Sequence, residues 1–326
     1  MHQQKVTVVI PNYNGIKYIK NCLDSLRNLK EEEPFHTIVV DNGSKDGSLE
    51  IIIQEYPEVE LIALPENTGF CHAVNVGIRA SRTPYVLLLN NDTVVRHGFV
   101  KYLTEAIEES ADIFSVSSMM LTMQDPTIID DAGDRYCVLG WAFARGKGRK
   151  ASEFEKKAEV FAACGGASLY RRAVFEEIGL FDETHFAYLE DMDIGYRARI
   201  FGYRNVYEPR ARVIHAGSAT SGSRYNEFKT RLSSANNAYL VGKNMPFLQL
   251  LLNLPFLVLG FLIKAVFFCR KKMGTLYVKG YFQGMKRCFT EEGKLHKVPF
   301  RWKHLKNYCR IQWMLYIDTI RAFIKS

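Results

Sequence analysis

The chain has few cysteines, and they form no recognisable pattern. Among its 326 residues there are seven, widely scattered and without a CxxC pair. An odd number at irregular spacing argues against a disulfide framework, and the missing pairs argue against a cysteine zinc site. We therefore expect reduced thiols in a cytosolic protein. They are Cys22, Cys71, Cys137, Cys164, Cys269, Cys288 and Cys309.

Leader, repeat and phosphate-loop signals are also missing. Met1–Lys5 runs directly into an apolar strand pattern without a leader-like apolar core, which argues against secretion. No internal repeat or low-complexity linker is present, so we expect one large domain with an appendage. Gly165-Gly166 lacks the residues that complete a phosphate loop, and Pro11–Gly15 holds no cation cluster for a triphosphate. The last absence argues against a nucleotidyltransferase.

The chain does contain short apolar runs separated by helical patterns. Val6–Ile10, Thr37–Val40 and Val86–Leu89 are typical of strands buried on both faces of a parallel sheet. Between them, residues 17–29 and 48–56 carry apolar side chains at helical spacing, the second with Ser48 as a candidate cap. This alternation predicts an α/β fold with a doubly wound, mostly parallel sheet and right-handed crossovers.

Polar loops follow all three predicted strands. They are Pro11–Gly15, Asp41–Ser44 and Asn90–Asp92. In parallel sheets, ligands bind beyond the carboxyl ends of the strands. Asn and Asp also favour turns for backbone reasons, so one such loop alone is equally a plain strand exit. Their recurrence at one sheet edge favours a ligand site.

A longer set of short motifs runs in order along the chain. The first group is Ile10–Gly15, Val40–Ser44, Asn67–Phe70 with Ala73, Asn75 and Gly77, and Asn90–Asp92. The second group is Gly165–Leu169, Arg171-Arg172, Gly179–Glu183 and Glu190–Asp193. Together they resemble the donor and acceptor halves of family 2 glycosyltransferases, closest to the rhamnosyltransferase-like subgroup that builds bacterial surface polysaccharides. The similarity covers about residues 5 to 220 and is specific only as an ordered set.

The resemblance implies a GT-A fold and inverting transfer of a sugar from a UDP- or dTDP-linked donor, dTDP-rhamnose among them, to a lipid-linked glycan. It implies that Asp92 meets a divalent cation, Mg²⁺ or Mn²⁺, and that Asp191, with Glu190 beside it, is the general base. The residues that would hold the base and ribose of the donor are Pro11, Asn12, Tyr13, Asn14 and Asp41. The other donor-side candidates are Asn67, Gly69, Asn75, Asn90, Asn91 and Gly166.

The chemistry of such a transfer explains these residue types. The diphosphate gathers negative charge as the sugar leaves it, and a carboxylate such as Asp92 suits the hard cation that offsets this charge. The attacking hydroxyl loses its proton to a positioned carboxylate, here Asp191. Glu190 and Asp191 also precede a helical pattern, where acids favour the positive end of the dipole. The structural and catalytic interpretations are compatible.

The metal motif departs from that of many relatives. Asn90 and Asn91 stand where a first acid is common, which predicts a weaker cation site. His215 ends a predicted strand and either completes the metal shell or is structural; imidazole suits Mn²⁺ better than Mg²⁺. The substitution also leaves open a catalytically idle nucleotide-sugar scaffold. The presence of Asp92 together with the 190–191 acids argues against that alternative.

The segment from Asp130 to Lys157 is rich in glycine and basic residues. Tyr136, Trp141 and Phe143 are candidate sugar-stacking side chains. The segment is either a mobile acceptor lid or an ordinary surface excursion.

Charge divides the chain into two parts. Residues 1–225 carry 25 basic and 31 acidic side chains, whereas residues 226–326 carry 18 and 4. We expect a GT-A domain over 1–225, with a nucleotide-sugar half (1–115) and an acceptor half (116–225), followed by a helical membrane-association region over 226–326. The basic residues of this tail interleave with long aliphatic runs, which argues against nucleic-acid binding.

The most apolar segment of the tail is Phe247–Phe268. It is long enough to cross a bilayer, but a single crossing would separate the basic stretch behind it from a cytosolic catalytic domain. We therefore expect an in-plane or re-entrant element, bent at Pro255, on the anionic cytoplasmic face of the membrane. Tyr308–Lys325 predicts an amphipathic helix with Trp313 and Ile320 on its apolar face and Asp318 on its polar face. The alternative is a soluble helical cap that packs on the sheet domain.

Overall fold

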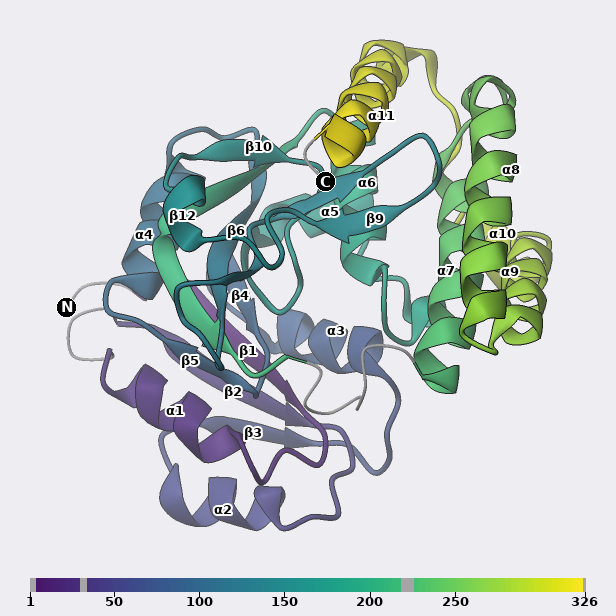
Figure 1. The fold of residues 1–326 in the computed structure, drawn as a ribbon. Coiled ribbons are helices and arrows are strands. Elements are labelled where there is room, and N and C mark those ends of the chain that lie inside the picture. Colours follow the sequence, from purple (N-terminus) through teal and green to yellow (C-terminus); the bar gives the residue numbers. More distant parts are fainter. Residues whose placement is uncertain (1–3, 30–33, 218–225, 325–326) are drawn as a thin grey trace.

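A ten-stranded mixed sheet forms the centre of the protein, shown in Figure 1 as a computed structural model that describes residues 4–29, 34–217 and 226–324. The parallel half runs in the spatial order β3 (Glu60–Ala63), β2 (His36–Asp41), β1 (Val6–Asn12) and β4 (Tyr85–Leu89). The predicted parallel strands are confirmed, and the sheet places their carboxyl ends at one edge.

The other half of the sheet is mixed. The antiparallel strand β11 (Ala167–Arg171) joins β4 to β6 (Ile113–Thr122), which pairs in parallel with β12 (Arg204–His215); β10 (Ala158–Val160) forms the edge. The short strands β5 (Thr93–Val95) and β7 (Ile129–Asp131) pair with β12 and β6, and β8 (Asp134–Tyr136) and β9 (Ala142–Ala144) form a separate hairpin. The predicted division at residues 115 and 116 falls inside β6.

Strand alternation assigns the helices to two faces of the sheet. Along β1, Val8 and Ile10 face α1 (Ile19–Arg27), α2 (Ser48–Glu55) and α4 (Phe99–Glu108), whereas Val9 faces α3 (Phe70–Ala80), α5 (Phe175–Ile178) and α6 (Glu190–Ile200). Because successive strand side chains point to opposite faces, both faces are apolar and both are covered. This is the predicted doubly wound arrangement.

One predicted helix start differs from the structure. Gly47, at φ +88°, caps α2, and Ser48 is its first residue. The Ser48 hydroxyl instead donates to Asp46 and contacts the amide of Asn12. Ser48 therefore links α2 to the end of β1.

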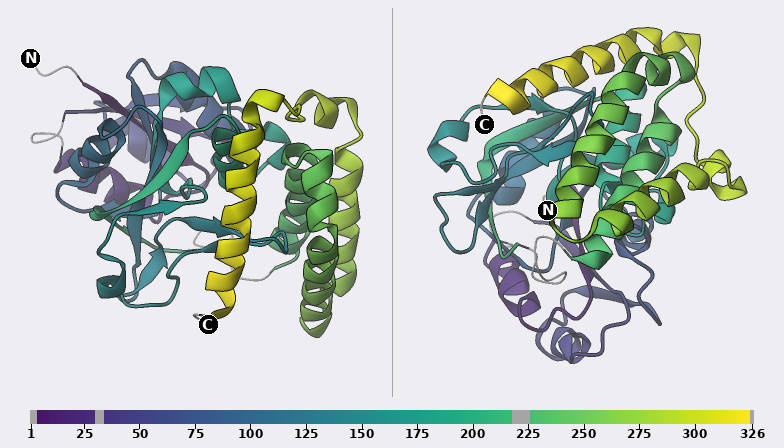
Figure 2. Two further views of the ribbon diagram at one scale, coloured as in Figure 1. Left: turned by 90° about the horizontal axis from the view of Figure 1, so that it is seen from above. Right: turned by 45° about the vertical axis from the view of Figure 1, so that its right-hand side comes forward.

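Five helices form the C-terminal region. They are α7 (Glu227–Asn244), α8 (Phe247–Arg270), α9 (Gly274–Arg287), α10 (Glu291–Leu295) and α11 (Leu305–Ile324). Figures 1 and 2 show α7, α8 and α9 stacked beside the sheet domain, whereas α11 lies over the sheet domain and contacts α8 through Gln312. The predicted boundary at residue 225 borders residues 218–225, which lie outside the described chain.

The last helix packs as a cap, which is the alternative that the sequence left open. Tyr308, Ile311 and Leu315 of α11 are buried against the outer face of α6. Asp318, predicted on the polar face, is 4% exposed and lies 3.8 Å from Arg135, while Trp313 is exposed. The burial of Asp318 differs from the predicted polar face, because tertiary packing places its carboxylate beside Arg135, whereas Trp313 and Ile320 of the predicted apolar face are both exposed.

Candidate functional site

A cleft of about 670 Å³ opens at the carboxyl ends of β1 and β4. Twelve of the predicted site residues line it, contributed by strand ends, the loop before β11 and the start of α6. They are Pro11, Asn12, Tyr13, Asn67, Gly69, Asn90, Asn91, Asp92, Gly166, Glu190, Asp191 and His215. The fold thus brings together residues that lie up to 204 positions apart in the sequence.

Asn12 organises the donor side of this cleft. Its amide nitrogen donates to Asp41 Oδ1 at 2.8 Å, and its amide oxygen accepts from Asn91 Nδ2 at 2.7 Å. All three side chains are buried. Asn12 therefore ties the ends of β1, β2 and β4 together, so that the three polar loops form one wall.

Three predicted donor residues do not line the cleft. Asp41 accepts from Asn12 and from the Ser44 backbone N–H. Asn14, at φ +50°, accepts from the Lys45 N–H. The Asn75 amide donates to the Phe181 carbonyl and to Glu183, both at 2.8 Å. In this structure these three side chains support the walls of the cleft.

Asp92 and His215 lie next to each other because β5 pairs with the end of β12. His215 is paired with Thr93 in the β5–β12 ladder, which places its Nε2 3.3 Å from Asp92 Oδ1. Its Nδ1 lies 2.7 Å from Asp130 Oδ2, and Lys147 pairs with Asp130 at 2.6 Å. Burial lowers the pKa of His215, but its bonds to Asp130 and Asp92 outweigh this and raise the pKa to about 9. A proton on His215 would therefore compete with a metal ion for the space between this imidazole and Asp92.

The acids predicted as base lie at the start of α6. Leu189, at φ +66°, caps the helix, and Asp191 accepts from the backbone N–H groups of Met192 at 2.7 Å and Gly165 at 3.4 Å. Burial raises the pKa of Asp191, although these bonds oppose the shift. Burial and the neighbouring Asp191 charge raise the pKa of Glu190 to about 8, and Glu190 Oε2 has no hydrogen-bond partner in the described residues.

Gly166 was predicted as a point of close approach. A Cβ atom there would lie 3.0 Å from the Asn90 amide and 3.3 Å from Met120. The Gly166 carbonyl accepts from the Asn90 N–H at 2.8 Å. Any side chain at this position would therefore press on Asn90 and narrow the cleft.

The segment 130–157 is not a free lid. Tyr136 is fully buried in the core formed by α6 and the C-terminal helices, so it cannot stack on a sugar. Trp141 Nε1 donates to the Gly260 carbonyl of α8, and Phe143 lies outside the lining of the cleft. The sugar-stacking prediction was wrong for Tyr136 because its apolar ring is used for packing.

Comparison with known proteins agrees with this geometry. Residues 7–179, more than half of the chain, match the family model described as glycosyl transferase family 2. The chain belongs to that family. It is also 28% identical over 239 residues, covering 66% of this chain and 77% of the relative, to an N-acetylglucosaminyl-diphospho-decaprenol L-rhamnosyltransferase of Mycobacterium tuberculosis.

Solved structures confirm the GT-A fold of this family 2 glycosyltransferase. GalNAc-T7 with UDP, GalNAc and Mn²⁺ superposes with a TM-score of 0.60 at 16% identity, covering 74% of this chain and 48% of that one. S. aureus TarS 1–349 in complex with UDP-GlcNAc gives a TM-score of 0.55 at 19% identity, covering 86% and 82%. At such identities the likeness shows the fold alone.

Several residues of this family 2 site were missed from the sequence. Asn42 lines the donor side, and its side chain accepts from the Thr68 N–H at 2.9 Å. It belongs to the motif Val40–Ser44, which could have identified it as a site residue. Asp130 lay in the segment interpreted as a lid, and no spacing rule connects it with His215. Phe186 and Tyr188 line the cleft at positive φ, which no periodicity indicates.

Proposed function

We propose that this family 2 glycosyltransferase moves a sugar, with inversion, from a UDP- or dTDP-linked donor to a hydroxyl of a lipid-linked glycan in surface polysaccharide synthesis. The relative named above acts, by its name, on a decaprenol-linked sugar and transfers rhamnose. We therefore include dTDP-rhamnose among the candidate donors. A nucleotide-sugar donor is further supported by the UDP-GlcNAc in the TarS complex.

One observation carries the proposal: a carboxylate–imidazole pair and a pair of buried acids line the same cleft. Asp92 and His215 offer an oxygen and a nitrogen 3.3 Å apart, a donor set that suits Mn²⁺. These two residues would hold the cation. When bound, the cation would supply charge stabilisation for the departing diphosphate.

Asp191 would take the proton from the attacking hydroxyl. Its raised pKa makes it a stronger base than a solvated aspartate, while the N–H groups of Met192 and Gly165 hold its orientation. Because the acceptor oxygen approaches from the base side and the nucleotide leaves on the other, the anomeric configuration inverts.

A donor screen tests this proposal. The purified protein is incubated with UDP- and dTDP-linked sugars and a lipid-linked acceptor, with Mg²⁺ and Mn²⁺ in turn, and the product and its anomeric configuration are identified by NMR. We expect transfer from one donor class and higher activity with Mn²⁺. Donor binding without hydrolysis or transfer under any condition would instead favour the idle scaffold.

We also propose that α8 binds the surface of the cytoplasmic membrane. Among the described residues it is the one helix long and apolar enough to cross a bilayer, and only 17% of its most apolar window is buried. Its polar interruptions face the protein: Asn253 and Gln249 are buried and bond to Gln312 of α11. The outer surface is therefore continuously apolar, with large side chains exposed from Phe247 to Phe267.

The form of α8 favours an in-plane element over a re-entrant one. The helix passes through Pro255 as a single element from Phe247 to Arg270. Exposed cations, Arg270, Lys271 and Lys272, follow its apolar surface, where they would meet anionic headgroups.

Vesicle flotation tests this membrane proposal. We expect the protein to float with vesicles containing anionic lipid and to be released only partly by high salt, because apolar contacts remain. Leu251→Glu with Leu262→Glu, on the exposed surface of α8, should abolish flotation. Flotation that persists in this variant would contradict the proposal.

A further inference from the structure

The segment between Asp182 and Asp191 holds an uncommon backbone conformation beside the cleft. Phe186, Tyr188 and Leu189 have φ values of +61°, +70° and +66°. Such values are rare for residues with side chains and persist only where surrounding contacts enforce them. Phe186, Ala187 and Tyr188 line the cleft, and Leu189 caps the helix that begins with Glu190 and Asp191.

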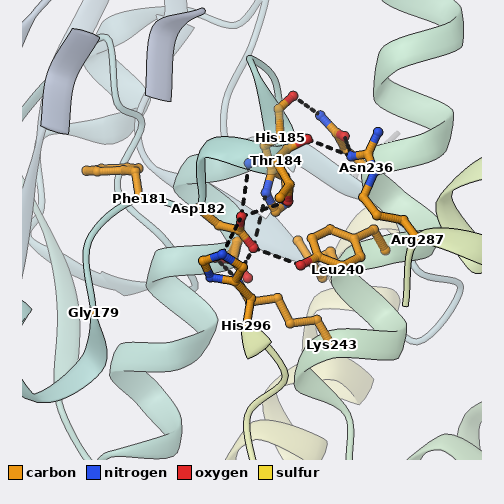
Figure 3. Close-up of polar contacts among 12 residues, drawn as sticks. Gly179, Phe181, Asp182, Thr184, His185, Asn236, Leu240, Lys243, Arg287 and His296 are labelled. Carbon is orange, nitrogen blue, oxygen red and sulfur yellow. Dashed lines mark hydrogen bonds and ion pairs between the residues drawn. The ribbon is translucent and has the colours of Figure 1, made fainter. Parts of the chain in front are cut away.

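One side chain of α7 provides much of this enforcement. The buried Asn236 amide nitrogen contacts the carbonyl of His185 at 2.8 Å (Figure 3). It also contacts the carbonyls of Ala187 at 2.8 Å and Tyr188 at 2.9 Å. The two hydrogens of this NH₂ group are shared among three carbonyls, which restrains the peptide units between them. Asn236 thus holds residues 185–188 together through their backbone carbonyls.

A residue of α9 fixes the orientation of that amide. Arg287 Nη1 donates to Asn236 Oδ1 at 3.0 Å and to the Thr184 carbonyl at 2.7 Å. Because the amide oxygen accepts from Arg287, the NH₂ group must point toward the three carbonyls. Two C-terminal helices therefore hold one loop of the sheet domain.

Lys243 of α7 forms ion pairs with one acid before the segment and one acid after it. Its Nζ lies 2.7 Å from Asp182 Oδ2 and 2.9 Å from Asp193 Oδ2, and it is 2% exposed. Tyr239 donates to Asp182 at 3.0 Å, and Asn244 donates to Asp193 at 2.7 Å. Asp182, Asp193 and His185 have the spacing of a metal cluster, but here the chain supplies the positive charge itself. Asp193 is two residues from Asp191, so this contact also fixes the start of α6.

We propose that Asn236, Arg287 and Lys243 are positioning residues for the base and for the 186–188 wall of the cleft, so that the C-terminal helices form part of the catalytic unit. The catalytic part of this inference rests on the proposed function, since it takes Asp191 as the base. The sequence predicted a tail that attaches the enzyme to the membrane, or alternatively a helical cap on the sheet domain. The contacts described here give α7 and α9 a second role.

The experiment compares two adjacent asparagines of α7. Asn236→Ala removes the contacts to the three carbonyls, whereas Asn237→Ala makes the same truncation at a buried neighbour whose Oδ1 has no hydrogen-bond partner in the described residues. Hydrogen–deuterium exchange of peptides covering 184–191, donor affinity, and kcat and KM are measured for both variants and the wild type. Arg287→Met, which frees the amide without removing it, is the second test variant if Asn236→Ala does not fold.

We expect Asn236→Ala to speed exchange in 184–191 and to lower kcat by roughly 10- to 100-fold, with donor affinity within about threefold of wild type, because a misplaced base affects chiefly the reacting geometry. Asn237→Ala should match wild type in all measurements. Equal exchange and kcat in the two variants would overturn the inference, as would a kcat loss explained by lost donor affinity. If the wild type shows no transfer, the proposed function fails, while the exchange data still decide whether Asn236 holds the segment.

Discussion

The buried carboxylates on the two sides of the cleft have different partners, and their pKa values shift in different directions. On the side of β5 and β12, Asp92 and Asp130 share His215, and Lys147 adds a further positive charge. Despite burial, these partners lower the pKa of Asp130 to about 2. On the side of α6, Glu190 and Asp191 have no cationic side chain as a hydrogen-bond partner in the described residues, and burial raises the pKa of both.

This difference shows that the surroundings, and not the residue type, decide what a carboxylate can do. An acid held ionised beside a cation suits charge binding, whereas a buried acid without a counter-charge has a raised affinity for a proton. One cleft thus holds carboxylates in both kinds of surroundings. The following substitutions test that contrast, from the largest expected effect to the smallest.

Asp191→Asn should have the largest effect. We expect kcat to fall by at least about 10³-fold, because the amide cannot accept the proton, while donor affinity stays nearly unchanged. Initial rates and calorimetric titration of the donor measure the two quantities. Wild-type kcat in this variant would remove Asp191 from the role of base.

Asp92→Ala tests the other side. We expect metal-dependent donor affinity to fall by on the order of 100-fold, because the variant removes a candidate ligand and leaves His215 paired only with Asp130. Donor titrations with and without Mn²⁺ measure this. Asp125→Ala, which removes an exposed acid outside the cleft, is the control. If Asp92→Ala bound donor and metal as tightly as the wild type, Asp92 would not be a metal ligand.

Asp130→Asn should have a smaller effect. The amide oxygen can still accept from His215 Nδ1, but the charge that orients the ring is lost, so we expect Mn²⁺ affinity to fall about 10-fold. Electron paramagnetic resonance of free Mn²⁺ measures this without reference to activity. An unchanged affinity would mean that His215 keeps its orientation without the Asp130 charge.

Glu190→Gln should change how stability depends on pH. In the folded protein the pKa of Glu190 is about 8, above the ordinary value of 4.5, so between these values the folded state binds more protons than the unfolded state. Wild-type stability should therefore fall as pH rises through this window, by up to about 1.4 kcal/mol per pH unit. Urea unfolding at pH 5, 6.5 and 8 should show a shallower fall in the variant. Parallel pH profiles would mean that Glu190 is ionised at neutral pH.

Three of the parallel strands and several helices could be predicted from the sequence, because apolar periodicity is local. Val86–Leu89 was predicted as a buried strand and forms most of β4, and the helical pattern after Asp191 corresponds to α6. The strands of segment 130–157 could not be predicted, because β8 and β9 are only three residues long and carry no sustained apolar alternation. The burial of Asp318 in α11 was also not predicted, since amphipathicity does not say which partner a helix meets.

The site was predictable only where functional residues stand in short ordered motifs. Asn12, Asp92 and Asp191 were found in this way and line one cleft. Asp130 and Asn236 were not, because each acts through one partner that lies far away in the sequence: His215, 85 positions from Asp130, and the 185–188 carbonyls, about 50 positions from Asn236.

The sequence by itself determined the fold class, the family, and the polar residues at the strand ends, since these follow from side-chain periodicity and from motifs that keep their order. Only the tertiary structure decided which acids share His215 and which have no cationic partner among the described residues, which face of α11 is buried, and how α7 holds the loop before α6. Those features depend on the distances and the local dielectric that arise when remote segments pack together, and no spacing along the chain encodes them.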